Sequence, residues 1–216
     1  MGQCIKLTNI VSLMKHKNNN LKDKKRKLFE LISSQGGYFT ARQALKIGYS
    51  YRSQKYNLGV GEWIKVGYGS YKLSNYPISE YSELIELCFW SRDKNDKPQA
   101  IISHQSALSV HKLGEVISAK VCFTVPKTFR KKIPKNYVCY KSTLEKDEIE
   151  EKEGFKVTTP IKTIIDVSER IDLEQLEKVV LDAYQKGFIN QHVIEKANTL
   201  DQTKRRLLNT FSKLKK

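Results

Sequence analysis

The residues of this chain that could do acid–base or metal chemistry are its histidines and one run of carboxylates, and neither set is arranged like a catalytic site. His104 and His111 lie one heptad apart. On a helix their rings would be two turns apart, roughly 10 Å, which is a poor spacing for a shared metal ion. We therefore expect these imidazoles to hydrogen-bond to the backbone. The acidic run EKDEIEEKE, residues 145–153, is most simply a solvated loop.

Other sequence signals of enzymatic chemistry are absent as well. The 216 residues contain no GxGxxG, P-loop, GxSxG or HExxH pattern. Cys4, Cys88, Cys122 and Cys139 are widely spaced and form no CxxC pair, which indicates reduced thiols and no structural zinc. We expect a cytoplasmic protein that is not an enzyme and needs no cofactor or metal. A nuclease that uses the acidic residues to hold a metal is a minor alternative.

The charge distribution points to a different chemistry, hydrogen bonding to a polyanion. Residues 1–75 carry 14 Lys/Arg and 3 Asp/Glu, a net charge of +11, whereas residues 76–216 carry 25 and 20, a net charge of +5. Nucleic acid is the natural partner of such a field. A generally lysine-rich surface is the alternative. No apolar run approaches the ~20 residues that cross a bilayer, so we expect no membrane partner.

The basic half contains elements that could position these cations, between Tyr38 and Leu73. Thr40 can cap a first short helix that Gly48 ends, because glycine readily adopts the left-handed conformation. Ser50 can cap a second helix, which the glycines at 59 and 61 stop. WIKV, a Gly-Tyr-Gly turn and SYKL then form a hairpin. Two helices followed by a two-stranded ribbon is the order of a winged helix-turn-helix.

The second helix would be the recognition helix. If Leu58 faces inward, Tyr51 and Gln54 lie on the same side. Arg52, Ser53 and Tyr56 then point outward, with Lys55 and Asn57 on the flanks. Gln54 could read adenine if it is not buried. The predicted DNA-binding residues are Arg42, Ser50, Tyr51, Arg52, Ser53, Gln54, Lys55, Tyr56, Lys65, Tyr68, Ser70 and Lys72. Because winged helices also bind proteins, a protein interface is the alternative use of this surface.

Three segments complete the predicted organisation. Residues 1–20 form an N-terminal extension, of which Met1 to Met14 could be an amphipathic helix. Residues 21–75 form the DNA-binding domain and begin with a helix from Lys22 to Ser34. The cations of this helix would lie near the DNA backbone or simply in solvent: Lys24, Lys25, Arg26 and Lys27. Residues 79–216 form a second domain, because Pro77 favours an extended boundary before it.

The second domain is predicted to be α+β with a helical C-terminal third. A helix from Ser79 to Trp90 opens it, and Ser103 caps a helix at 104–113. Four strands are expected, at residues 99–103, 119–126, 137–142 and 154–160. Thr159 and Pro160 open the next helix as cap and first-turn proline. Helices capped by Asp172 and Asn190, and one from Asp201 to Leu214, end the chain.

An ordered set of segments extends this interpretation to a family. FTARQALKIGYSYRSQKY, GEWIKVGYGSYKL, IISHQSALSVHKL, FTVP and VTTPIKTIIDV follow one another from Leu28 to about Ala183. Together they resemble the AbiEi-type antitoxin family of type IV toxin–antitoxin systems, in which abortive phage infection is a frequent role. One departure concerns the wing, because many relatives have a basic residue where this chain has Tyr68.

The resemblance implies a function in two parts. The N-terminal winged helix would bind inverted repeats of double-stranded DNA at its own promoter and repress transcription. The C-terminal domain would counteract a nucleotidyltransferase-like toxin without needing a stable complex with it. The alternative is a winged-helix transcription regulator whose second domain is a protein-binding module unrelated to toxin neutralisation.

Overall fold

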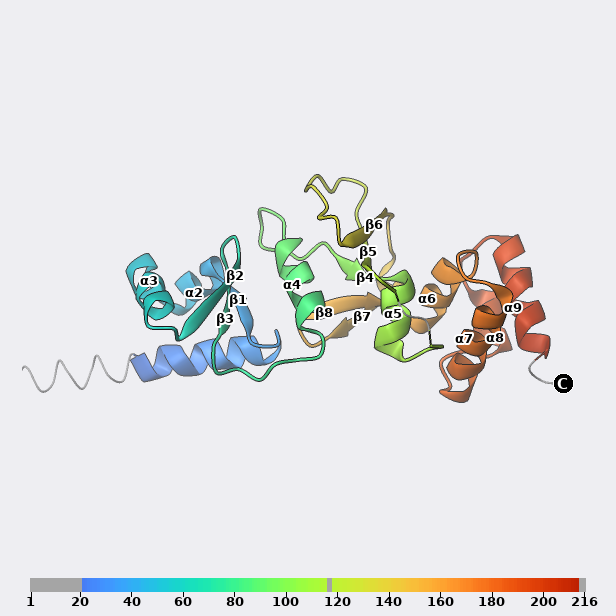
Figure 1. The fold of residues 1–216 in the computed structure, drawn as a ribbon, viewed down its shortest axis with the longest axis horizontal. Helices are drawn as coiled ribbons and strands as arrows, with labels where there is room; N and C mark the ends of the chain where they lie inside the picture. Colours follow the sequence, from blue (N-terminus) through green and yellow to red (C-terminus); the bar gives the residue numbers. More distant parts are fainter. Residues whose placement is uncertain (1–20, 116–117, 214–216) are drawn as a thin grey trace, which may run out of the picture. The chain divides into compact units, whose positions relative to one another are not determined.

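The chain has a mixed α+β architecture made of two compact units, residues 1–90 and 91–216 (Figure 1). The structure is a computed structural model and describes residues 21–115 and 118–213. Within these residues, no helix is both long enough and apolar enough to cross a membrane. The predictions for residues 1–20, for Cys4 and for Leu214 lie outside the described residues.

The first unit ends later than the sequence predicts. Helix α4 (Ser82–Trp90) was expected to open the second domain, but it packs on strand β1 (Tyr38–Thr40) of the first unit. The Phe89 ring lies 5.8 Å from that of Tyr38, and the Tyr38 hydroxyl donates to Glu86 at 2.9 Å. The helix also begins three residues late, because Ser79 accepts a hydrogen bond from the Tyr81 amide in the turn before it.

The first unit contains a three-stranded antiparallel sheet together with helices (Figure 1). The helix at residues 21–33 precedes β1, and α2 (Ala41–Ile47) and α3 (Tyr51–Gly59) follow. The hairpin of β2 (Trp63–Gly67) and β3 (Ser70–Leu73) comes next, and β1 pairs with β3 to give the order β1-β3-β2. The two helices and the hairpin confirm the sequence prediction of these elements, whereas β1 was not expected.

Local capping explains where α2 and α3 begin and end. Thr40 accepts from the Gln43 amide, and the Gln43 side chain accepts from the Thr40 amide in return. This reciprocal box satisfies amides that the first turn of a helix leaves unpaired. Gly48 ends α2 with φ 102°, and Ser50 caps α3 by accepting from the Ser53 amide. All three predicted caps are confirmed.

An aromatic core holds the first unit together. The Trp63 ring lies edge-on to Phe39 at 4.7 Å and to Tyr49 at 5.0 Å. Leu28 and Ile32 of the first helix complete this core. Gly37 joins that helix to β1 with φ 88°, and a Cβ there would lie 2.4 Å from the Tyr76 ring. Only glycine fits this turn without strain.

The second unit is built on a five-stranded mixed sheet of order β6-β5-β4-β8-β7. The parallel pairs are β4 with β8 and β5 with β6, and the other two pairs are antiparallel. The strands are β4 (Ile101–Ile102), β5 (Val121–Val125), β6 (Tyr137–Lys141), β7 (Ile149–Lys152) and β8 (Phe155–Thr158).

Helices cover this sheet and form the C-terminal third. Helix α5 contacts β5, β8 and α6, while α7 and α8 both contact α9. Their apolar faces share one core that includes Leu108, Ile164, Leu176 and Leu207. The helices are α5 (His104–His111), α6 (Pro160–Val167), α7 (Leu173–Gln185), α8 (Gln191–Lys196) and α9 (Asp201–Lys213).

Two sequence predictions for the second unit are wrong. The acidic run at 145–153 is not a loop, because Lys146–Glu148 form a 3-10 turn and β7 follows as an edge strand paired with β8. Ser103 and Thr159 occupy their cap positions but make no side-chain cap hydrogen bond. The Ser103 hydroxyl accepts from Thr124 instead. Asp172 and Asn190 do cap their helices, and Cys88, Cys122 and Cys139 are free thiols.

Candidate nucleic-acid interface

One side of α3 presents two aromatic rings and two cations to solvent. Tyr51, Arg52, Lys55 and Tyr56 are all exposed, with 73% of Tyr51 and 67% of Tyr56 accessible. Their spacing, i, i+1, i+4 and i+5, places them on one face of a helix. No acidic residue occurs in α3. We call these four residues the α3 face.

The opposite side of α3 contains the two buried amide side chains of the helix. Gln54 is 3% exposed, and its Nε2 donates to the carbonyl oxygens of Ala41 at 3.2 Å and Tyr49 at 3.3 Å. Asn57 is 8% exposed. Gln54 is therefore buried as the helical wheel suggests, and its amide cannot reach a base.

The predicted orientation of α3 is wrong at two positions. Tyr51 was placed inward with Leu58, yet it is exposed, and Asn57 was placed on a flank, yet it is buried. Leu58 itself is partly buried and packs against the core of the unit, as predicted. Tyr51, the first residue of the helix, lies two turns away from Leu58 and its side chain is exposed.

The hairpin adds one exposed ring and one exposed cation. Tyr68, at the tip between two glycines, is fully exposed, and Lys65 is exposed on β2. Ser70 is 6% exposed, because it pairs with Thr40 of β1 on one side and Gly67 of β2 on the other. The buried Ser70 side chain therefore cannot contact DNA. Lys72 is half-buried, with its Nζ 5.2 Å from the centre of the Tyr38 ring.

The two serines at the start of α3 are engaged in capping. The Ser50 side chain accepts from the Ser53 amide at 3.2 Å, and the Ser53 hydroxyl donates to the Ser50 carbonyl at 2.8 Å. Ser50 stays exposed and Ser53 is partly exposed. Their first role is to fix the beginning of the helix that carries the α3 face.

Few acidic residues occur in the elements that carry the exposed cations. Arg42 and Lys46 of α2 are exposed, as are Arg52 and Lys55 of α3 and Lys65 of β2. Glu62, the single acidic residue from Tyr38 to Leu73, is paired with Lys25 at 3.2 Å. In the first helix, Arg26 pairs with Asp23 at 2.7 Å and Glu30 at 2.9 Å, and Lys27 pairs with Asp23 at 2.8 Å. Carboxylates therefore offset part of the charge of the first helix, whereas α2, α3, β2 and β3 contain no acidic residue.

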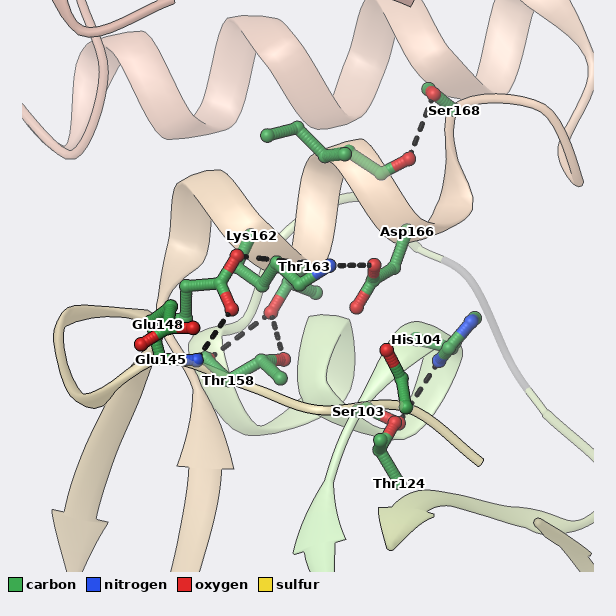
Figure 2. Close-up of polar contacts among 12 residues, drawn as sticks. Ser103, His104, Thr124, Glu145, Glu148, Thr158, Lys162, Thr163, Asp166 and Ser168 are labelled. Atoms are coloured by element: carbon green, nitrogen blue, oxygen red, sulfur yellow. Dashed lines mark hydrogen bonds and ion pairs between the residues drawn. The ribbon is translucent and has the colours of Figure 1, made fainter. Parts of the chain in front are cut away.

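A polar cluster in the second unit includes Ser103, His104, Lys162 and Asp166 (Figure 2). His111 bonds to the Thr158 carbonyl at 2.7 Å, as expected. His104 bonds to Ser103 at 2.9 Å, a side-chain partner rather than the predicted backbone one. Burial, with help from the charges of Arg170 and Lys162, lowers the pKa of His104 to about 4. The imidazole is thus neutral at pH 7.

The charged members of the cluster connect α6 to the 3-10 turn at Lys146–Glu148. Lys162 donates to Asp166 at 2.6 Å and lies 4.0 Å from Glu148 (Figure 2). Burial raises the pKa of Asp166, although its bond to Lys162 acts in the opposite direction. Across the described residues, no group of three or more His, Cys, Asp and Glu side chains is placed to hold a metal ion.

Comparison with known proteins informs the fold only. No family model matches the chain, and no curated protein matches it. The crystal structure of the RV2827C protein from Mycobacterium tuberculosis is similar, with a TM-score of 0.50 and 11% sequence identity over 86% of this chain and 76% of that chain. At this identity the likeness concerns the fold and carries no function.

Proposed function

We propose that the first unit is a winged helix-turn-helix that binds double-stranded DNA. The observation that carries the proposal is the α3 face, where Arg52 and Lys55 lie exposed between two tyrosines on a helix without acidic residues. Arg and Lys can donate to guanine O6 and N7 and to phosphate oxygens. The Tyr68 hairpin would be the wing, which contacts the adjacent backbone or minor groove.

The family resemblance extends this proposal to a cytoplasmic autorepressor and antitoxin. The first unit would bind its own promoter, and the second unit would counteract a nucleotidyltransferase-like toxin. The support for the antitoxin role is the ordered segment set from Leu28 to Ala183.

A promoter reporter tests the autorepressor role. We expect the wild-type protein to lower expression from its own upstream region, and the double variant Arg52→Ala/Lys55→Ala to restore it at equal protein level. Co-expression with the toxin tests the second role, because the double variant should still protect cells. A reporter that does not respond to the wild-type protein would rule out autorepression.

The competing function is a second unit that binds a protein directly, either the toxin or another partner, and one loop favours it. The segment between β5 and β6 buries Phe129, which anchors it, and exposes five cations. These cations are Lys127, Arg130, Lys131, Lys132 and Lys135. An acidic partner protein would fit this surface. Co-purification of the tagged chain with the toxin at moderate salt would favour this function over neutralisation without a complex.

A further inference from the structure

The burial of both α3 amides limits which bases the α3 face can read, if the proposed function holds. Asn and Gln are the side chains that recognise adenine by two hydrogen bonds. Gln54 and Asn57, the two amides of α3, are buried and cannot do so. The exposed residues that remain are two cations, suited to guanine or phosphate, and two tyrosine rings.

Tyr51 and Tyr56 are highly exposed for aromatic side chains and lie five positions apart on α3. Within the described residues, neither Tyr51 nor Tyr56 is in contact with another aromatic ring, and about 70% of each side chain is accessible. A tyrosine supplies a large contact surface while losing little conformational entropy. Five residues of α-helix span roughly 7.5 Å, which is about two base-pair steps of duplex DNA.

We propose that Tyr51 and Tyr56 determine sequence preference by packing on thymine C5-methyl groups in the major groove. The methyl is the apolar feature that the major groove presents, and apolar side-chain surface recognises it. If α3 lies along the groove, the two contacted thymines are about two base pairs apart. Arg52 and Lys55, between the rings, contact guanine or phosphate at the intervening positions.

Uracil substitution isolates this contact, because deoxyuridine lacks only the methyl group. Duplexes are first selected from a random library by the full-length protein, and the enriched duplex is resynthesised with deoxyuridine at one thymine at a time. We expect about fourfold weaker binding for each contacted thymine, the effect of losing one buried methyl group. Two such positions should appear in each half-site.

Variants then assign the contacts to individual rings. Tyr51→Ala and Tyr56→Ala should each abolish the thymine–uracil difference at one position, whereas Tyr51→Phe and Tyr56→Phe, which keep the ring, should preserve it. Tyr68→Ala is the matched control, because the wing does not face the major groove. It should weaken binding to both duplexes equally.

Each outcome separates the inference from the proposed function. An enriched duplex bound equally well with thymine and uracil would overturn the tyrosine contacts and leave sequence-specific DNA binding intact. Failure of the selection to enrich any duplex would refute the proposed function itself. Tighter binding of single strands than of the duplex would mean that the rings stack on unpaired bases, which also overturns the inference.

Discussion

At the scale of single residues, the first unit separates amides that hold structure from cations that can bind. Gln54 donates to the carbonyls of Ala41, at the start of α2, and Tyr49, just before α3, whereas Arg52 two positions earlier is exposed. Among the described residues, no ion pair joins Arg52 or Lys55 to a carboxylate. The positive charges of Arg52 and Lys55 are therefore available to bind a polyanion.

Gln54→Ala should therefore change stability and not base preference. The substitution leaves the Ala41 and Tyr49 carbonyls without their donor and should lower the free energy of unfolding by about 1–3 kcal/mol. Chemical denaturation followed by tryptophan fluorescence measures it, because both tryptophans, Trp63 and Trp90, belong to the first unit. An altered preference between duplexes with unchanged stability would show that Gln54 reads bases.

His104 should make the second unit sensitive to acid. Its pKa is about 4 in the folded chain against 6.5 in the unfolded chain, so the unfolded chain binds the proton first as the pH falls. The free energy of unfolding should decrease between about pH 6.5 and pH 4, by up to roughly 3 kcal/mol. The lowered pKa of His111, also due to burial, acts in the same direction.

Denaturation followed by far-ultraviolet circular dichroism at several pH values checks this, since five of the described helices belong to the second unit. His104→Asn should flatten the pH dependence, and asparagine tolerates the left-handed backbone of His104, with φ 54°. An equally steep dependence in the variant would contradict the assignment to His104.

At the scale of elements, two glycines of the first unit should respond oppositely to alanine. Gly37→Ala should lower the free energy of unfolding by several kcal/mol, because φ is 88° and the new Cβ would meet the Tyr76 ring. Gly59→Ala is the matched control. Nothing lies within 4 Å of its Cβ position and its φ is not positive, so alanine should stabilise α3 by about 0.5–1 kcal/mol. The measurement is the shift of the denaturation midpoint relative to wild type. Shifts of the same sign in the two variants would contradict this account.

The sequence predicts these elements well where the signal is local. Thr40, Gly48 and Ser50 mark the ends of α2 and α3 because capping depends on residues at most four positions away. Strand β1 could not be found this way, since three residues become a strand only by pairing with β3. The edge strand β7 was hidden for the same reason, because its glutamates resemble a loop until β8 lies beside it.

The location of the candidate site could be predicted from the sequence. Which residues of α3 face the core and which face solvent could not. The basic charge and the caps identify α3 from sequence. Which side faces the core depends on the carbonyls that Gln54 meets, and these come from Ala41 and Tyr49. Sequence reasoning missed that Tyr51 belongs to the exposed face. Burial of Asn57 had no sequence signal.

At the scale of the whole molecule, the position of the unit boundary can be tested by truncation. Residues 21–90 should fold cooperatively on their own, whereas residues 21–75 should not. The shorter fragment lacks α4, whose Ile85, Leu87 and Phe89 are at most 3% exposed. Circular dichroism and thermal denaturation of both fragments measure this. Equal stability of the two fragments would show that the boundary lies at Asn75–Pro77, as the sequence predicts.

Equilibrium binding of the full chain to duplex DNA from its own upstream region tests the central claim most directly. It is compared with a scrambled duplex at low and at physiological salt. We predict a preference for the upstream duplex that persists at the higher salt. Five exposed cations predict a slope of log affinity against log salt of roughly −4 to −5. They are Arg42, Lys46, Arg52, Lys55 and Lys65.

Arg52→Ala should weaken binding to the upstream duplex by about 5-fold to 150-fold and reduce the preference, because one bidentate base contact is worth about 1–3 kcal/mol. Arg205 of α9 is also exposed, so Arg205→Ala is the charge-matched control and should leave the preference unchanged. Equal affinity of the wild-type protein for both duplexes, lost as salt rises, would contradict sequence-specific DNA binding by the α3 face.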